Sequence, residues 1–144
     1  MKTWLVAAWL CCSAGMATAA EHTVQMLNSG PEGSMVFSPQ YLTVAVGDTV
    51  RFKAVNSGHY VRSLALPDGV EPWLSEEDQD YSVRIDQPGV YFYMCPPHLM
   101  MAMVGIIQAG APVNLAQVRE VAADKRGRIL MNGPRFDALL GRLR

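Results

Sequence analysis

The chain has 144 residues, half of them hydrophobic, and its 12 basic and 13 acidic side chains leave a formal net charge of −1. This length allows one domain with a buried core. The near-neutral charge argues against nucleic-acid binding, which calls for a basic face with aromatic platforms. Charge is nevertheless uneven along the chain: residues 21–110 carry four basic and ten acidic side chains (net −6), and residues 111–144 carry seven and three (net +4).

The first twenty residues have the pattern of an export signal. Lys2 provides the positive start, Trp4–Cys12 is almost wholly apolar, and Ala17-Thr18-Ala19 fits the small-x-small cleavage pattern. The apolar run is shorter than the roughly 20 residues that a membrane-spanning helix needs. We therefore expect residues 1–20 to be a signal peptide, cleaved after Ala19 or Ala20, and the mature chain to be periplasmic without membrane insertion.

Removal of this segment would leave one cysteine, Cys95, because Cys11 and Cys12 belong to the signal. A single cysteine cannot form a disulfide within the chain. A lone thiol is at risk in an oxidising compartment unless it is protected, and metal ligation is one form of protection.

From residue 21 to residue 110 the hydrophobic pattern is that of β-strands, because apolar and polar residues alternate in short runs separated by turn residues. Gly47-Asp48 marks a turn, and residues 64–80 read as irregular. The alternating runs lie at residues 23–27, 35–37, 42–46, 50–54, 81–85, 90–94 and 103–108. We expect this region to form one all-β sandwich domain.

The pattern changes to a helical period after Gly110. Leu115, Val118 and Ala122 are spaced for one helix, which Asn114 could cap and Gly127 could end. A second helix is expected to open at Pro134. Residues 111–144 are therefore predicted to be an extension of two short α-helices packed on the sandwich.

The loop between the strands at 90–94 and 103–108 concentrates metal-binding side chains. Cys95, His98 and several methionines occur within nine residues, and His59 lies just past another strand. Two imidazoles, a thiolate and a weak thioether are the ligand set of a blue-copper electron-transfer centre. Zinc is a poorer match, because methionine is a poor ligand for it and zinc prefers four N, S or O donors.

Four methionines lie close enough in sequence to supply the thioether. Met94 precedes Cys95 on an alternating strand, so its side chain should point to the opposite face, into the core. Met100, Met101 and Met103 remain open on this reasoning.

The same loop resembles the cupredoxin family and, within it, the pseudoazurins. Cys95 and His98 are followed by a methionine eight positions after the cysteine and then by Val104-Gly105. Further similar stretches are Gly33-Ser34-Met35-Val36-Phe37, Val46-Gly47-Asp48-Thr49-Val50, Gly58-His59 and Pro88-Gly89-Val90-Tyr91.

This resemblance implies a Greek-key sandwich of about eight strands and a single type 1 copper bound by His59, Cys95, His98 and Met103. An amicyanin-like spacing would instead select Met101. The resemblance also implies a periplasmic carrier of one electron, and we expect the protein to be a monomer. Its expected partners are a c-type cytochrome and copper nitrite reductase or another periplasmic reductase.

Three features depart from the pseudoazurin pattern. Tyr60 replaces an asparagine that ties the ligand loops together, Pro96 replaces threonine or serine, and the acidic run Glu76-Glu77-Asp78 stands where lysines are usual. The acidic run suggests a partner with a basic or apolar docking face. The predicted contact patch around His98 consists of Met35, Pro97, Leu99, Met100 and Met101.

Two other functions share part of this ligand pattern. A copper enzyme would need histidines for a second centre, but the chain has only His22, His59 and His98. We therefore expect a protein that is not an enzyme. A periplasmic copper carrier or chaperone is the alternative, because thioethers favour Cu(I) and the loop is rich in methionine.

Overall fold

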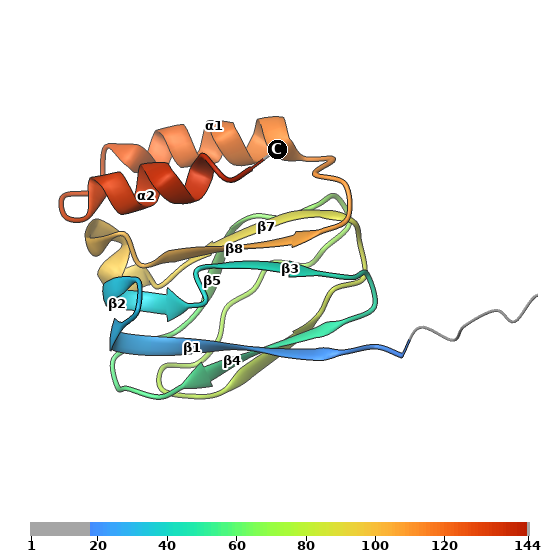
Figure 1. Cartoon of the computed structure of the whole chain (residues 1–144), viewed down its shortest axis with the longest axis horizontal. Helices are drawn as coiled ribbons and strands as arrows, with labels where there is room; N and C mark the ends of the chain where they lie inside the picture. Colours follow the sequence, from blue (N-terminus) through green and yellow to red (C-terminus); the bar gives the residue numbers. More distant parts are fainter. Residues whose placement is uncertain (1–17, 144) are drawn as a thin grey trace, which may run out of the picture.

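The computed structural model describes residues 18–143, so the predicted signal peptide lies outside the described residues except at its last three positions. Eight strands are followed by two helices (Figure 1). The elements are β1 (Glu21–Gly30), β2 (Gly33–Ser38), β3 (Tyr41–Val44), β4 (Thr49–Ala54), β5 (Arg62–Ala65), β6 (Tyr81–Arg84), β7 (Gly89–Met94), the 3-10 helix η1 (Pro96–Met101), β8 (Val104–Ala109), α1 (Leu115–Arg126) and α2 (Gly133–Leu140). Across the described residues, no helix has the length and apolar character that a membrane crossing requires.

The strands form two four-stranded sheets packed face to face. One sheet has the order β2-β1-β4-β6 and the other β3-β8-β7-β5. The parallel pairs β1 with β4 and β3 with β8 arise because the chain crosses between the sheets. This arrangement is the Greek-key sandwich of eight strands with two C-terminal helices that the sequence predicts.

All six residues of β7 are buried, although the strand has the period of two expected of a sheet. Tyr91 and Tyr93 face the other sheet and join the core between the sheets. Val90, Phe92 and Met94 face outward and pack beneath α1 and α2. Figure 1 shows both helices lying over this one sheet, so β7 is apolar on both faces.

The helices occupy the predicted positions, but Asn114 has a different role from the one predicted. Its side chain makes no cap hydrogen bond to the start of α1. Instead, Asn114 Oδ1 accepts the Val90 N–H at 2.8 Å and Nδ2 donates to the Val90 carbonyl at 2.8 Å. The side chain thus joins the beginning of α1 to β7.

Some strand predictions were wrong in detail. β1 continues to Gly30, although the turn residues after Leu27 predicted an earlier end. Val46 lies past the end of β3 and is 49% exposed, not on a buried face. β5 was not predicted, because it has only four residues and pairs with β7 through an irregular register that breaks the alternation.

Candidate metal centre

Three of the predicted ligands come together at one end of the sandwich. Cys95 follows β7, His98 lies in η1, and His59 lies in the loop after β4. Their ligand atoms all lie within 4.8 Å of one another. Cys95 Sγ is 3.8 Å from His59 Nδ1 and 3.5 Å from His98 Nδ1.

The backbone of the ligand loop closes on itself. Prolines open η1, and the His98 N–H donates to the Cys95 carbonyl at 3.1 Å. Ala102 then adopts a left-handed conformation (φ 61°), which turns the chain back. The Met103 N–H donates to the His98 carbonyl at 3.2 Å, and the Cys95 N–H donates to the Met103 carbonyl at 2.9 Å. The loop therefore returns Met103 to the side of Cys95.

The spacing of the three donor atoms fits one metal ion. Imidazole nitrogen and thiolate bind a first-row metal such as zinc at about 2.0 and 2.3 Å, so two such donors 120° apart lie roughly 3.7 Å from each other. The distances of 3.5 and 3.8 Å from the sulfur agree with this trigonal arrangement. Two nitrogens and a thiolate in a trigonal plane are the donor set that copper uses in electron-transfer sites.

Burial shapes the charge states of these donors. Cys95 is fully buried, which raises the pKa of its thiol to about 11, although the backbone N–H groups of Tyr60 and His98 lower it in part. Burial also lowers the pKa of His59. The apo site thus holds a neutral imidazole and a protonated thiol at neutral pH, and binding a cation releases the thiol proton.

Asn28 orients the ring of His59. Asn28 Oδ1 lies 2.8 Å from His59 Nε2, so Nε2 carries the proton and Nδ1 is left to face the sulfur. No spacing in the sequence links residue 28 to residue 59. The role of Asn28, which directly follows the strand expected at residues 23–27, was therefore not predicted.

Asp78 braces the His59 loop from the other side. Its carboxylate accepts the N–H of Gly58 at 2.6 Å and of His59 at 3.4 Å, and its own N–H donates to the His59 carbonyl at 3.0 Å. The backbone N–H of Tyr60 faces the Cys95 sulfur and lowers the pKa of its thiol. These contacts hold the loop at Tyr60, where the resemblance led us to expect an asparagine.

The methionines separate by environment. Met103 is fully buried in the same core cluster as Cys95, whereas Met94 belongs to the cluster beneath the helices. Met100 is 47% exposed, and Met101 is half-buried. Burial beside the thiolate favours Met103 as the axial ligand, and this assignment stays a prediction.

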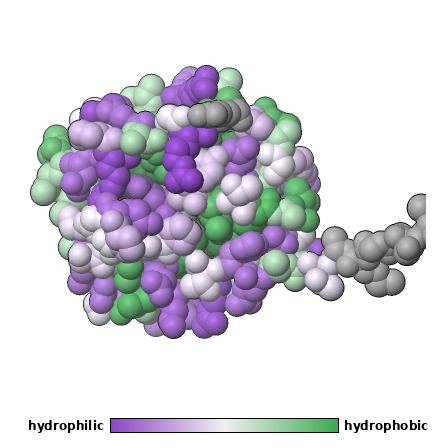
Figure 2. Space-filling model, in the orientation of Figure 1, coloured by the Kyte–Doolittle hydropathy of each residue, from purple (hydrophilic) through white to green (hydrophobic). Residues whose placement is uncertain are grey.

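The exposed apolar patch near His98 differs from the predicted one. Leu99 is buried beneath the helices and cannot contribute to the patch. Leu130 and Met131, between α1 and α2, are 72% and 51% exposed, and their N–H groups both donate to the Met100 carbonyl at 2.9 Å. The patch therefore includes Pro97, Met100, Leu130 and Met131. Figure 2 shows hydrophobic residues reaching the surface at the left end, where η1 lies in Figure 1.

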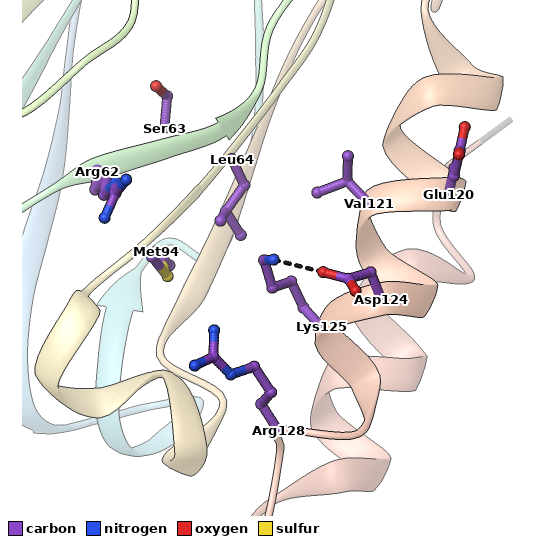
Figure 3. A pocket seen from close by; sticks show the side chains of 9 residues that line it. All are labelled: Arg62, Ser63, Leu64, Met94, Glu120, Val121, Asp124, Lys125 and Arg128. Atoms are coloured by element: carbon purple, nitrogen blue, oxygen red, sulfur yellow. Dashed lines mark hydrogen bonds and ion pairs between the residues drawn. The ribbon is translucent and has the colours of Figure 1, made fainter.

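A separate pocket lies between β5 and α1 (Figure 3). Its wall carries both basic and acidic side chains, among them Arg62, Lys125, Glu120 and Asp124. The side chains of the metal cluster do not line it. The chemistry of the cluster thus belongs to the ligand loops and not to this hollow.

Comparison with known proteins agrees with this geometry. Residues 24–110 match the family model described as copper-binding proteins of the plastocyanin/azurin family. Pseudoazurin of Paracoccus pantotrophus is 37% identical over 129 residues, which cover 88% of this chain and 89% of the relative.

Solved structures agree as well. The pseudoazurin from Methylobacterium extorquens AM1 superposes with a TM-score of 0.73 at 31% identity, covering 85% of this chain and 98% of that one. The pseudoazurin from Hyphomicrobium denitrificans superposes with a TM-score of 0.66 at 33% identity, covering 76% and 95%.

Proposed function

Since the chain belongs to the plastocyanin/azurin family of copper-binding proteins, and within it to the pseudoazurins, we propose that it carries single electrons on a copper bound by His59, Cys95, His98 and Met103. The observation that carries this proposal is the buried convergence of Cys95 Sγ with one nitrogen of each histidine. The protein is an electron carrier and not an enzyme.

A bound copper supplies the Cu(II)/Cu(I) couple. The protein keeps its donors nearly fixed while the charge of the site changes. Cys95 and Met103 lie at the two ends of a loop anchored in the neighbouring strands β7 and β8, and their backbones are hydrogen-bonded to each other. Asn28 fixes His59, and burial keeps water from Cys95. Because the donors move little, the energy needed to rearrange them during electron transfer is small.

His98 provides the route to the surface. Its ring is half-buried, whereas His59 and Cys95 are fully buried, and the exposed Pro97 and Met100 lie beside it in the loop. We infer that a partner docks on the apolar patch and exchanges the electron through His98.

Titration of the purified apo-protein with Cu(II) tests this function. We expect an intense thiolate-to-copper absorption band, the EPR signal of a type 1 centre and a reversible reduction potential. Cys95→Ser should lose the band completely. A wild-type protein that stays colourless, binds only Cu(I) and passes it to an acceptor would instead be a copper chaperone.

The axial ligand is tested by two matched variants. Met103→Leu should raise the reduction potential, because loss of the weak thioether donor favours Cu(I). Met101→Leu should leave the potential unchanged. The reverse result would assign the axial position to Met101.

Pseudoazurins exchange electrons with other redox proteins. For this chain we propose a c-type cytochrome or a periplasmic reductase such as copper nitrite reductase, with a basic or apolar docking face. Glu76 and Glu77 are exposed and adjoin Asp78, which contacts the His59 loop. Negative charge therefore lies close to the proposed exit route for electrons.

Export to the periplasm stays a prediction from the first twenty residues. Fusing residues 1–20 to the N-terminus of a reporter enzyme that is active only after export would test this prediction. We expect exported activity from this fusion and none after Lys2 and the apolar run have been removed.

A further inference from the structure

Arg135, in the first turn of α2, reaches from the helical extension to the metal end of the sandwich. Its guanidinium donates to carbonyl oxygens of two segments that are far apart in the sequence. Nη1 donates to Ser34 at 2.9 Å and more weakly to Glu32 at 3.4 Å, both in the β1–β2 hairpin. Nη2 is shared among Met35 at 3.1 Å, Met101 at 2.8 Å and Ala102 at 3.2 Å.

These acceptors are all backbone carbonyls, in contrast to the carboxylate partner of Arg126. Arg126 bonds to the Asp137 carboxylate in an exposed ion pair. Arg135 is half-buried, and burial lowers the pKa of its guanidinium. It still carries a positive charge at neutral pH, because the ordinary pKa of arginine is about 12.5 or higher.

Neighbouring residues add further hydrogen bonds to the ligand loop. Asn132 Nδ2 donates to the Met101 carbonyl at 3.0 Å, and the N–H groups of Leu130 and Met131 donate to the Met100 carbonyl. Three successive carbonyls of the loop are thus held by residues 130–135. The last of them belongs to Ala102, whose left-handed backbone directs the chain into Met103.

We propose that Arg135 is a positioning residue of the copper centre: by clamping Met101 and Ala102 to the β1–β2 hairpin, it fixes Met103 and tunes the reduction potential. This inference rests on the proposed function. It gives the helical extension a part in setting the site, in addition to covering the sheet. The positive charge of Arg135 also favours Cu(I), so position and charge act on the potential together.

Two variants of Arg135 separate position from charge. Arg135→Lys keeps the charge but has a single ammonium in place of the planar fork that reaches both segments. Arg135→Gln removes both. We expect the ratio of the thiolate-to-copper absorption bands and the EPR hyperfine splitting to change in both variants. The potential should fall further in Arg135→Gln, because this variant also loses the cation.

The matched control is Arg126→Gln, which removes an exposed arginine of the same helical pair. It should leave the bands, the hyperfine splitting and the potential at wild-type values. Asn132→Gly is a smaller change. Residue 132 has a left-handed backbone (φ 59°), which glycine adopts without strain, so this variant loses only the side-chain bond to the Met101 carbonyl. It should shift the spectrum in the same direction as Arg135→Lys, by less.

Amide hydrogen exchange in the apo-protein provides a reading that needs no copper. The Met103 N–H should exchange roughly tenfold faster in Arg135→Gln, as expected when about one net hydrogen bond is lost locally, and at the wild-type rate in Arg126→Gln. If Arg135→Gln does not fold, Arg135→Lys and Asn132→Gly decide the question.

Wild-type spectra and potential retained in Arg135→Lys and Asn132→Gly, with unchanged Met103 exchange, would overturn the inference. Failure of the proposed function is a different outcome, since the wild-type protein itself would then lack the thiolate-to-copper band.

Discussion

The contact between Asn28 and His59 shows how one amide decides the chemistry of a ligand. Asn28→Ala would leave the ring of His59 free to rotate and to exchange its proton between the two nitrogens. Loss of such a partner typically costs about 10–100-fold in metal affinity. We expect this loss in Cu(II) affinity, measured by competition with a chelator. Ser29→Ala, one position along β1, should bind copper as the wild type does; equal affinity of both variants would show that Asn28 is dispensable.

Asp48 makes folding stability depend on acidity. It is buried, and the N–H of Ala20, the side chain of His22 and the N–H of Ala45 hold its pKa at about 2, below the ordinary 3.8. The unfolded chain therefore takes up this proton at a higher pH than the folded chain does. The contribution of Asp48 to stability is present above about pH 4 and is lost as the pH falls toward about 2.

The melting temperature of the apo-protein between pH 5 and pH 2 measures this dependence. Asp48→Asn should melt lower than the wild type at pH 5, and its melting temperature should fall less across the acid range. The exposed Asp68→Asn should follow the wild-type curve. A wild-type dependence retained in Asp48→Asn would assign the effect to other groups.

Single residues were predictable where their chemistry is visible in a short stretch. Cys95 and His98 are three positions apart, and the structure places them with His59 around one point. The residues that hold His59, in contrast, come from positions 28 and 78. Nothing local distinguishes Asn28 from an ordinary turn residue, since its role arises only when β1 lies beside the His59 loop.

At the level of elements, Asn114 takes the place of a missing strand. β5 pairs with β7 only from Phe92 to Met94, so Val90, which pairs with Gln108 of β8 on one side, has no strand partner on the other. The Asn114 amide both accepts from and donates to Val90, as a neighbouring backbone would. Asn114→Ala should lower the free energy of unfolding by about 1–3 kcal/mol, because a buried backbone pair loses its partner.

Urea unfolding followed by circular dichroism measures this loss. Glu120→Ala, an exposed change in the same helix, should stay within about 0.5 kcal/mol of the wild type. A similar small effect of Asn114→Ala would mean that water replaces the amide at Val90.

Elements were predictable where one period dominates. The strands with a single exposed face and the two helices follow from hydrophobic spacing, and α1 ends at Arg126 before Gly127 as expected. Asn114 reads as a cap in the sequence because its preference for helix starts is local. In the fold, its bonds to Val90 replace that role. β5 was not predicted, because its four residues pair irregularly and show no hydrophobic period.

For the molecule as a whole, the acidic run Glu76-Glu77-Asp78 and the apolar patch together form the proposed docking end. Glu76→Lys with Glu77→Lys should slow association with a cytochrome of basic docking face by about tenfold at low ionic strength, and rising salt should remove the difference. Asp78 is left unchanged, because it braces the His59 loop. Stopped-flow kinetics over a range of salt concentrations measures the effect.

The matched control reverses the charges of Asp68 and Glu71, which are both exposed. Asp68 lies beside Pro88 and Val113, away from the ligand loops. This control should change the rate much less. If the association rate of the wild type did not depend on salt concentration, apolar contact alone would guide docking.

The guanidinium of Arg135 bonds to a hairpin that lies about 100 residues earlier in the chain. Contacts of such long separation form late, because the intervening chain must first be ordered. The carbonyls of Met100, Met101 and Ala102 lack these bonds until α2 has formed and docked. A chain truncated before residue 130 would therefore present a less ordered ligand loop.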